Sequence, residues 1–210
     1  MYRADDCYRT AVVDTLVANS TSMESVTIHF FCDYADQKTL CAIEIFGSLA
    51  KQLLSTFNQI PKEMEKMIRD AYGDGTLIPD ASTVLDILLA AVKLFNRVYI
   101  VLDGVDECKG EDRLEVIAAI RTMSSADPEE SALRLFVSSR ADVDFERALE
   151  YSIHLQVNAK NISPDIKSFI AGIVKDKERS GDLSVRDPGL LNEIIAILAD
   201  KADGMYKNLF

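Results

Sequence analysis

The stretch from Val98 to Cys108, VYIVLDGVDEC, decides how the chain is expected to fold. Residues 98–102 form a short apolar run rich in β-branched and aromatic side chains, which is typical of a strand buried on both faces of a parallel sheet. The run stops at Asp103, and Asp106 and Glu107 follow within one turn. Ligands of open α/β sheets bind at this end of the strands, so the three carboxylates mark a candidate site.

Two interpretations fit these carboxylates. In the first they serve a Mg²⁺ ion, which takes oxygen ligands and bridges to phosphate oxygens. Asp103 would then face the metal, and Glu107 would polarise an attacking water molecule. In the second interpretation they form an acidic turn after a core strand, which is common in α/β proteins. The stretch alone does not decide between the two.

Composition limits the class of protein. The chain has 210 residues, of which 48% are hydrophobic and 27% charged, as expected for one globular domain or one domain with part of another. A net charge of −11 without a Lys/Arg cluster argues against nucleic-acid binding. The four cysteines show no CxxC spacing, so neither a zinc site nor a disulfide framework is expected. With no signal-peptide pattern and no apolar run of membrane length, we expect a cytoplasmic protein that does not bind membranes.

Strands and helices are predicted to alternate. Besides the acidic strand, apolar runs predict strands at Val26–Cys32 and Leu133–Ser138, and a short alternating pattern predicts a fourth at Ile153–Val157. Helical periodicity and capping residues predict helices from Ala11 to Asn19, Lys38 to Phe57, Pro61 to Tyr72, Ser82 (as N-cap) to Phe95, Leu114 to Met123, Ser163-Pro164 to Glu178, and from Asp187-Pro188 to a C′ residue at Gly204. Such alternation predicts an α/β fold with a parallel sheet.

Several phrases of the chain, taken together, resemble the NACHT nucleotide-binding domain of STAND-class signalling P-loop NTPases, and most of all its fungal, nephrocystin-like branch. VYIVLDGVDEC resembles the Walker B strand with its acidic extension, and LRLFVSSR (Leu133 to Arg140) resembles the sensor strand. The other phrases, in the same order as in the family, are FFCDYADQKT from Phe30, FGSLAKQLL from Phe46, ISPDIKSFI from Ile162 and LADKADGM from Leu198.

The resemblance implies a fold and a site. The fold would be a three-layer P-loop NTPase-type parallel sheet in residues 1–160, followed by the start of a helical lid region in residues 161–210. The ligands would be ATP or GTP with Mg²⁺. Asp103 would be the metal-linked acid, and Asp106 and Glu107 the catalytic pair that activates water. Arg140 would be the residue that senses the phosphate.

The chain also departs from the family. No GxxxxGK[ST] loop is present, although such a loop supplies the backbone N–H groups and the lysine that hold the phosphates. Arg9-Thr10 resembles a degenerate Lys-Thr, but no glycine stands before it. The family's first strand, which lies between the sensor strand and the fifth strand, is missing too. We therefore expect an N-terminally truncated module with impaired nucleotide binding, in which residues 153–157 pair directly with residues 133–138.

Two functions remain open. One is a nucleotide-dependent signalling switch that hydrolyses ATP or GTP slowly. The other is a non-catalytic interaction module, or a truncated relic, whose partners are other protein segments or further copies of itself. A metal-dependent phosphatase of the haloacid-dehalogenase type fits poorly, because it needs a DxD motif and this strand ends in DGVD.

The residues singled out have simpler explanations as well. Glu107 could be a solvated acid at a helix N-terminus, and Arg140 an ordinary surface arginine. If they form a site, Asp103, Asp106 and Glu107 should lie near Arg140, because the two strands that carry them are neighbours in this fold. His29 is interpreted as a core residue, and Cys32, Cys41 and Cys108 as small buried side chains.

Overall fold

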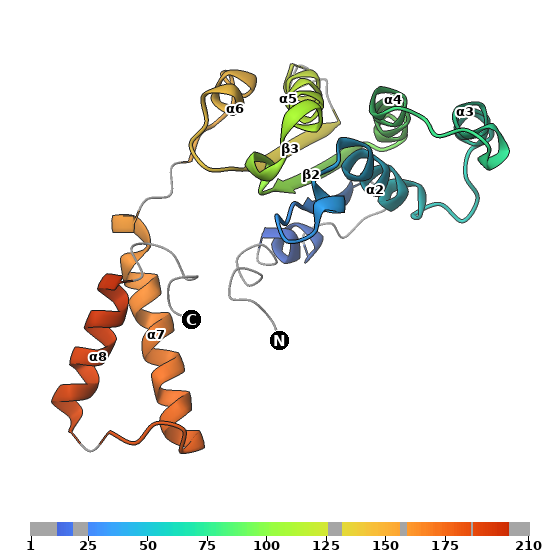
Figure 1. Ribbon diagram of the computed structural model, residues 1–210. Helices are drawn as coiled ribbons and strands as arrows, with labels where there is room; N and C mark the ends of the chain where they lie inside the picture. Colours follow the sequence, from blue (N-terminus) through green and yellow to red (C-terminus); the bar gives the residue numbers. More distant parts are fainter. Residues whose placement is uncertain (1–11, 19–24, 126–131, 156–158, 186, 202–210) are drawn as a thin grey trace. The chain divides into compact units, whose positions relative to one another are not determined.

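The computed structural model describes residues 12–18, 25–125, 132–155, 159–185 and 187–201. The chain divides into two units, one from Thr10 to Ser152 and one that contains the segment from Ile153 onward (Figure 1). The sequence had placed this division between residues 160 and 161. The first unit holds a parallel sheet, and the second holds two long helices.

The sheet of the first unit has three strands, β1 (Ser25–Phe31), β2 (Arg97–Asp103) and β3 (Leu133–Ser138). All are parallel and lie in the order β1-β2-β3, with the acidic strand β2 in the centre. Three of the four predicted strands are thereby confirmed to within one residue at each end. The α/β fold predicted from the alternation of strands and helices is also confirmed.

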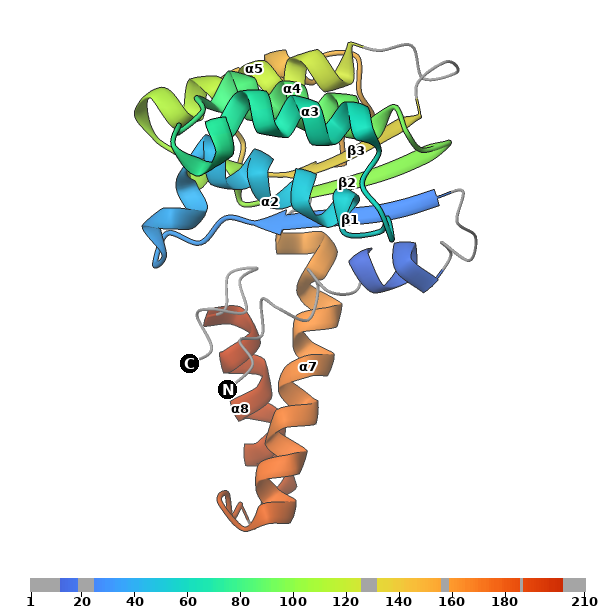
Figure 2. The same cartoon turned by 90° about the vertical axis from the view of Figure 1, so that its right-hand side faces the viewer.

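Helices α2 (Ala42–Leu54), α3 (Lys62–Tyr72), α4 (Ala81–Val92) and α5 (Gly110–Ser124) connect the strands. Both crossovers step in the same direction along the sheet, and parallel crossovers are right-handed, so these helices lie on one face. Figure 2 shows α3, α4 and α5 on that face and the short helix over residues 12–18 on the other. Because the three strands are parallel, their carboxyl ends lie at one edge of the sheet, which is where ligands of open α/β sheets bind.

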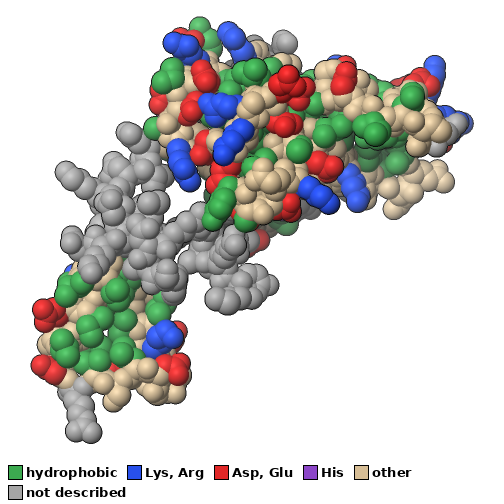
Figure 3. Space-filling model, viewed as in Figure 1, with side chains coloured by type: hydrophobic (Ala, Val, Ile, Leu, Met, Phe, Trp, Pro, Cys, Tyr) green, Lys and Arg blue, Asp and Glu red, His purple; other side chains and the backbone are tan. Residues whose placement is uncertain are grey.

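The second unit is a hairpin of helices α7 (Ala159–Ser180) and α8 (Pro188–Lys201). Hydrophobic side chains gather along it (Figure 3), and its core is formed by Ile166, Ile170 and Val174 of α7 against Leu191, Ile195, Leu198 and Ala199 of α8, with Leu183 between the helices. The start of α8 at Pro188 is confirmed, because Asp187 Oδ1 accepts a hydrogen bond of 2.8 Å from Gly189 N–H. No helix among the described residues is long and apolar enough to span a membrane.

The predicted start of α7 at Ser163-Pro164 is wrong, since the helix already begins at Ala159 and Pro164 lies inside it. A proline costs little only in the first turn of a helix, where the N–H groups have no intrahelical partner, and Pro164 lies one turn further on. The Ser163-Pro164 pair therefore indicates the N-terminal part of this helix but not its first residue. Gly204, the expected end of α8, lies outside the described residues.

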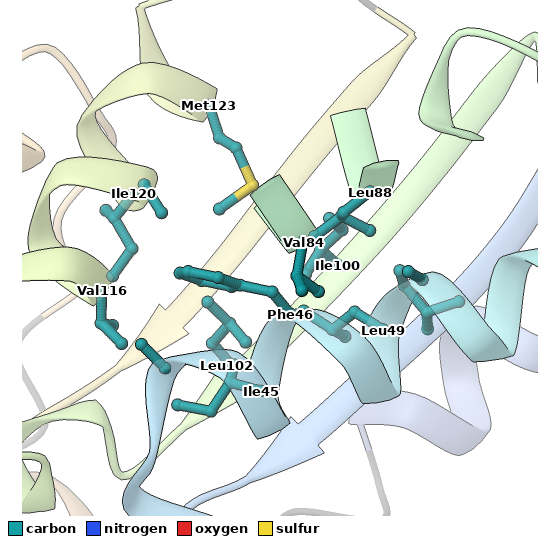
Figure 4. Packing of buried hydrophobic residues seen from close by; sticks show 14 of the residues in the cluster. Ile45, Phe46, Leu49, Val84, Leu88, Ile100, Leu102, Val116, Ile120 and Met123 are labelled. Atoms are coloured by element: carbon teal, nitrogen blue, oxygen red, sulfur yellow. The ribbon is translucent and has the colours of Figure 1, made fainter. Parts of the chain in front are cut away.

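The core of the first unit lies between the sheet and the helices α2, α4 and α5. Phe46 of α2 is 1% exposed and points toward Ile120 and Met123 of α5 (Figure 4). The same cluster contains residues of the sheet and of the helices, namely Ile100 and Leu102 of β2, Leu49 of α2, Val84 and Leu88 of α4, and Val116 of α5. This single apolar cluster fixes β2 in position and with it the acidic residues that follow.

The predicted long helix over residues 38–57 is shorter than expected. A 3₁₀ turn, η1 (Gln37–Leu40), comes first, and Cys41 is extended (φ −88°, ψ 128°) before α2 begins. Cys41 does not cap α2 with its side chain; Asp112 of α5 does, by accepting a hydrogen bond of 2.8 Å from Ala42 N–H. The cap comes from a residue far away in the sequence, so local periodicity could not locate it.

The boundaries of two further helices, α4 (Ala81–Val92) and α5, also differ from the prediction. The N-cap of α4 is Asp80 rather than Ser82, because Asp80 Oδ1 accepts a hydrogen bond of 2.8 Å from Thr83 N–H. That helix ends at Val92 rather than Phe95, while α5 begins at Gly110 instead of Leu114. Ser and Asp are both good N-caps, so the pattern narrows the start of α4 to two positions without choosing between them.

The predicted fourth strand is wrong as far as it is described. Residues 153–155 form no strand, and the side chains of Ile153 and Leu155 are 94% and 82% exposed. Residues 156 and 157 lie outside the described part. The short helix α6 (Val143–Ala148) and a turn closed by Ser152 N–H to Leu149 O follow β3 instead. Alternation of apolar and polar residues permits a strand, but a strand also needs a neighbour with which to pair.

The outer edge of β1 is closed by a side chain. Gln52 of α2 accepts a hydrogen bond of 3.1 Å from His29 N–H and donates one of 2.8 Å to His29 O. His29 itself is half-buried. These two bonds occupy backbone groups that would otherwise be available to a strand from another molecule.

Replacing Gln52 by alanine is therefore expected to destabilise the first unit by about 1–2 kcal/mol and to promote self-association. Urea denaturation followed by circular dichroism, together with size-exclusion chromatography, measures both effects. Lys51→Ala is the matched control, because Lys51 is the neighbour of Gln52 in α2 and its side chain is exposed to solvent. Equal stability and equal elution of the two variants would contradict the role given to Gln52.

Candidate functional site

The candidate site lies at the carboxyl edge of the sheet, where β2 and β3 end side by side. Asp103, the last residue of β2, pairs in register with Ser138, the last residue of β3. The Ser138 hydroxyl donates a hydrogen bond to Asp103 Oδ1, and Asp103 Oδ2 is buried. The neighbouring strand thus holds the predicted metal-facing acid in place. Ser138 was predicted as a strand end but not as a partner of this carboxylate.

Gly104 turns the chain at this edge. Its φ of +71° is a left-handed conformation, and a Cβ at this position would lie 2.9 Å from Cys32 O. The backbone is held on both sides, by Gly104 N–H to Ser138 O and by Cys32 N–H to Asp103 O. A glycine is therefore required for the acidic turn η3 (Val105–Glu107) to follow β2 directly.

Asp106 lies against the end of β3. Its Oδ1 accepts a hydrogen bond of 3.1 Å from Arg140 N–H, and its Oδ2 lies 3.5 Å from Arg140 Nε. The predicted proximity of the acidic strand end and Arg140 is confirmed by these contacts. The Arg140 side chain is 80% exposed and that of Asp106 only 13%, so the guanidinium extends toward solvent. An ion pair with such an exposed member contributes little to stability.

The segment that carries Arg140 is fixed from α5. Arg113 Nη2 donates a hydrogen bond of 2.6 Å to Asp142 Oδ1, and its guanidinium lies 4.8 Å from the ring centroid of Phe145. The same Asp142 oxygen accepts a hydrogen bond from Asp144 N–H and caps α6. These contacts hold the chain immediately after Arg140, which keeps that residue beside Asp106.

Glu107, the third carboxylate, has a different partner from Asp103 and Asp106. Its Oε2 accepts a hydrogen bond from the N–H of Tyr34, in the loop after β1. Helix α5 begins only at Gly110, so Glu107 precedes it and is not a solvated acid in its first turn. No sequence pattern predicts this contact, because nearly every residue type carries a backbone N–H.

The fit of this site to Mg²⁺ depends on whether its carboxylates face a common point. The three carboxylates, Asp103, Asp106 and Glu107, each bind a different partner in the protein. Within the described residues, no group of three or more His, Cys, Asp and Glu side chains is arranged to hold a metal ion. The residues present therefore do not fit a metal site made by the protein alone. Mg²⁺ often takes one or two carboxylates and completes its shell with phosphate and water.

Two cysteines are buried next to the acidic turn: Cys108 directly follows η3, and Cys32 follows β1. Cys32 and Cys108 are each 1% exposed, and their Sγ atoms are 4.0 Å apart. The hydrogen bond with Cys108, together with burial, raises the pKa of the Cys32 thiol. Both match the prediction of small buried side chains, whereas Cys41 is only half-buried. Arg9-Thr10, the sequence most like a phosphate-binding Lys-Thr, lies outside the described residues.

Comparison with known proteins gives one match. Residues 7–140 match the model of a family described as nephrocystin 3, N-terminal. The matched range is more than half of the chain and includes β1, β2, β3 and the four candidate residues Asp103, Asp106, Glu107 and Arg140. No curated protein and no solved structure matches the chain.

Proposed function

Because the chain belongs to the nephrocystin 3 N-terminal family, we propose that its first unit is a NACHT-type nucleotide-binding module of the STAND class. In this proposal the carboxyl edge of β2 and β3 forms the half of an ATP or GTP site that faces the magnesium ion and the terminal phosphate. The observation that carries the proposal is the contact of Asp106 with Arg140 across the ends of neighbouring parallel strands. An acid and a cation at this edge are what a bound metal–phosphate group needs.

Each of the four residues has a proposed role. Asp103, held by Ser138, would face the magnesium ion that accompanies the nucleotide. Asp106 and Glu107 would orient and activate a water molecule, and the exposed guanidinium of Arg140 would contact the phosphate. Glu107 would have to leave the Tyr34 amide before it could accept a proton from water. Hydrolysis is accordingly expected to be slow or absent in the state described.

The affinity for nucleotide is expected to be weak. The sequence has no GxxxxGK[ST] loop, and such a loop provides most of the N–H groups and the lysine that bind phosphates. Three carboxylates close together repel a phosphate unless a cation lies between them. Asp106 already neutralises part of the charge of Arg140. A single guanidinium therefore has to supply most of the attraction.

Titration of the full chain with a fluorescent ATP or GTP analogue tests the proposal. With Mg²⁺ present, we expect a dissociation constant of roughly 1 mM or weaker. Asp103→Ala and Arg140→Ala should each weaken this binding several-fold, because each removes one of the few groups that face the ligand. Asp86→Ala is the control, since this exposed carboxylate lies on α4, away from the site.

Two results would contradict the proposal in different ways. Low-micromolar affinity that is lost in Asp103→Ala would show that the site is complete and that binding is not impaired. Binding that does not depend on Mg²⁺, and is unchanged in both site variants, would exclude a nucleotide site at this edge.

A second candidate function is a non-catalytic interaction module. It is favoured by Phe136 of β3, whose side chain is 41% exposed in the middle of a strand. An exposed aromatic side chain on a sheet is a common feature of protein interaction surfaces. Partners would then be other protein segments or a second copy of the chain. The nucleotide titration separates the two functions, because an interaction module requires no response to Asp103→Ala.

A further inference from the structure

Cys32 and Cys108 join two segments that are far apart in the sequence. Cys32 directly follows β1, and Cys108 ends the acidic turn η3 that follows β2. Their sulfur atoms are 4.0 Å apart across a sequence separation of 76 residues, and both side chains are buried. The two thiols are therefore in direct contact, and each is the nearest possible reaction partner of the other.

The backbone on both sides of this sulfur pair is already held together. Cys32 N–H donates a hydrogen bond of 2.9 Å to Asp103 O, and Cys32 O packs closely against Gly104. On the other side, Tyr34 N–H binds the carboxylate of Glu107. A disulfide has an S–S bond of about 2.05 Å, so the sulfurs need to approach by roughly 2 Å. Such a movement requires side-chain rotation and a small shift of η3, with the strands left in place.

We propose that Cys32 and Cys108 form a reversible intramolecular disulfide that locks the acidic turn to the end of β1. The oxidant is a peroxide. One thiol attacks a peroxide oxygen, the O–O bond breaks, and a sulfenic acid and one water molecule are formed. The second thiol attacks the sulfenic sulfur, the S–O bond breaks, and a disulfide and a second water molecule result. Two thiols are oxidised by two electrons in total, and one H₂O₂ is reduced to two H₂O.

The disulfide would restrict the turn that carries Asp106 and Glu107. Glu107 would be held near the Tyr34 amide, and η3 would lose the freedom to move away from β1. The cross-link would also close a long loop in the unfolded chain, which stabilises the folded state. Neither effect requires nucleotide, so the inference does not depend on the function proposed above.

Burial sets the conditions under which the bond forms. Both thiols are 1% exposed, so a peroxide reaches them only when the turn opens. Cys41 is half-buried and its Sγ makes a long hydrogen bond of 3.6 Å to Gln37 O, so it should react sooner with an alkylating reagent than the buried pair. The order of reactivity expected in the reduced protein is therefore Cys41 first and the buried pair later.

Mass spectrometry of the full chain tests the proposal. Trypsin places the four cysteines in four different peptides, namely residues 4–9, 10–38, 39–51 and 98–109. After treatment with hydrogen peroxide and digestion without reductant, we expect peptide 10–38 linked to peptide 98–109, with the loss of two hydrogens. Dithiothreitol should reverse the link. Oxidation should raise the thermal midpoint of the first unit by about 5 °C or more.

Matched variants make the result specific. Cys41→Ser should leave the link and the thermal shift unchanged, whereas Cys32→Ala and Cys108→Ala should abolish both. If either alanine variant fails to fold, alkylation by N-ethylmaleimide before peroxide treatment of the unaltered chain serves as the second block. Links that involve Cys7 or Cys41, oxidation to sulfinic acid without a link, or no reaction of the pair would overturn the proposal. In the last case the two residues are small core side chains only.

Discussion

Phe46→Ala is expected to destabilise the first unit by about 3–5 kcal/mol. The side chain is 1% exposed, and it lies where α2 and α5 meet above the sheet (Figure 4). Removing the ring takes away its burial and leaves a cavity that Ile120, Met123 and Leu102 can only partly fill. A whole domain is stable by roughly 5–15 kcal/mol, so this one change removes a large share.

Urea denaturation measured by circular dichroism gives the free energy of unfolding for this test. Phe136→Ala is the matched control, because the same ring is removed from a position that is 41% exposed. Its cost should be below about 1 kcal/mol. Equal midpoints for the two variants would show that the packing around Phe46 does not carry the stability assigned to it.

The strands were predictable because their signal is local. A strand buried on both faces needs a continuous apolar run, and Val98–Leu102 provides one, whereas Leu133–Ser138 is a mostly apolar run that Arg134 interrupts. The strand prediction failed at residues 153–155, because alternation describes one strand and says nothing of the neighbour with which it must pair. The predicted start of a helix was wrong where the capping residue lies far away in the sequence, as with Asp112 of α5 at the start of α2. Contacts with residues far away in the sequence cannot be predicted from a local pattern.

The candidate site was predictable to a similar extent. Strand ends and the resemblance to the NACHT family together predicted that the three acidic residues lie near Arg140, and the contacts of Arg140 confirm this for Asp106. The separate partners of the three carboxylates were not predictable, since Tyr34 contributes a backbone N–H and Ser138 acts through the register of two strands. Asp103 was expected to face a metal ion, and Asp106 and Glu107 to activate water; in the structure each of the three carboxylates has its own partner in the protein.

Gly104→Ala has the second large expected effect, and Gly110→Ala is its matched control. Both glycines have positive φ, 71° and 59°, so an alanine at either position incurs the cost of the left-handed conformation, about 1–2 kcal/mol. They differ in the space around them. A Cβ at Gly110 would meet nothing within 4 Å, whereas at Gly104 it would lie 2.9 Å from Cys32 O.

Because the atom facing Gly104 belongs to the backbone, the clash cannot be relieved by rotating a side chain. Either β1 or the acidic turn must shift, which would weaken the hydrogen bond from Tyr34 N–H to Glu107. We expect Gly104→Ala to cost about 3 kcal/mol in total and Gly110→Ala about 1 kcal/mol. Hydrogen exchange should be faster at Tyr34 and across η3 in the Gly104 variant alone. If both variants lose the same stability and exchange alike, the close approach of Gly104 to Cys32 does not position the acidic turn, and the turn must be held by its carboxylate contacts instead.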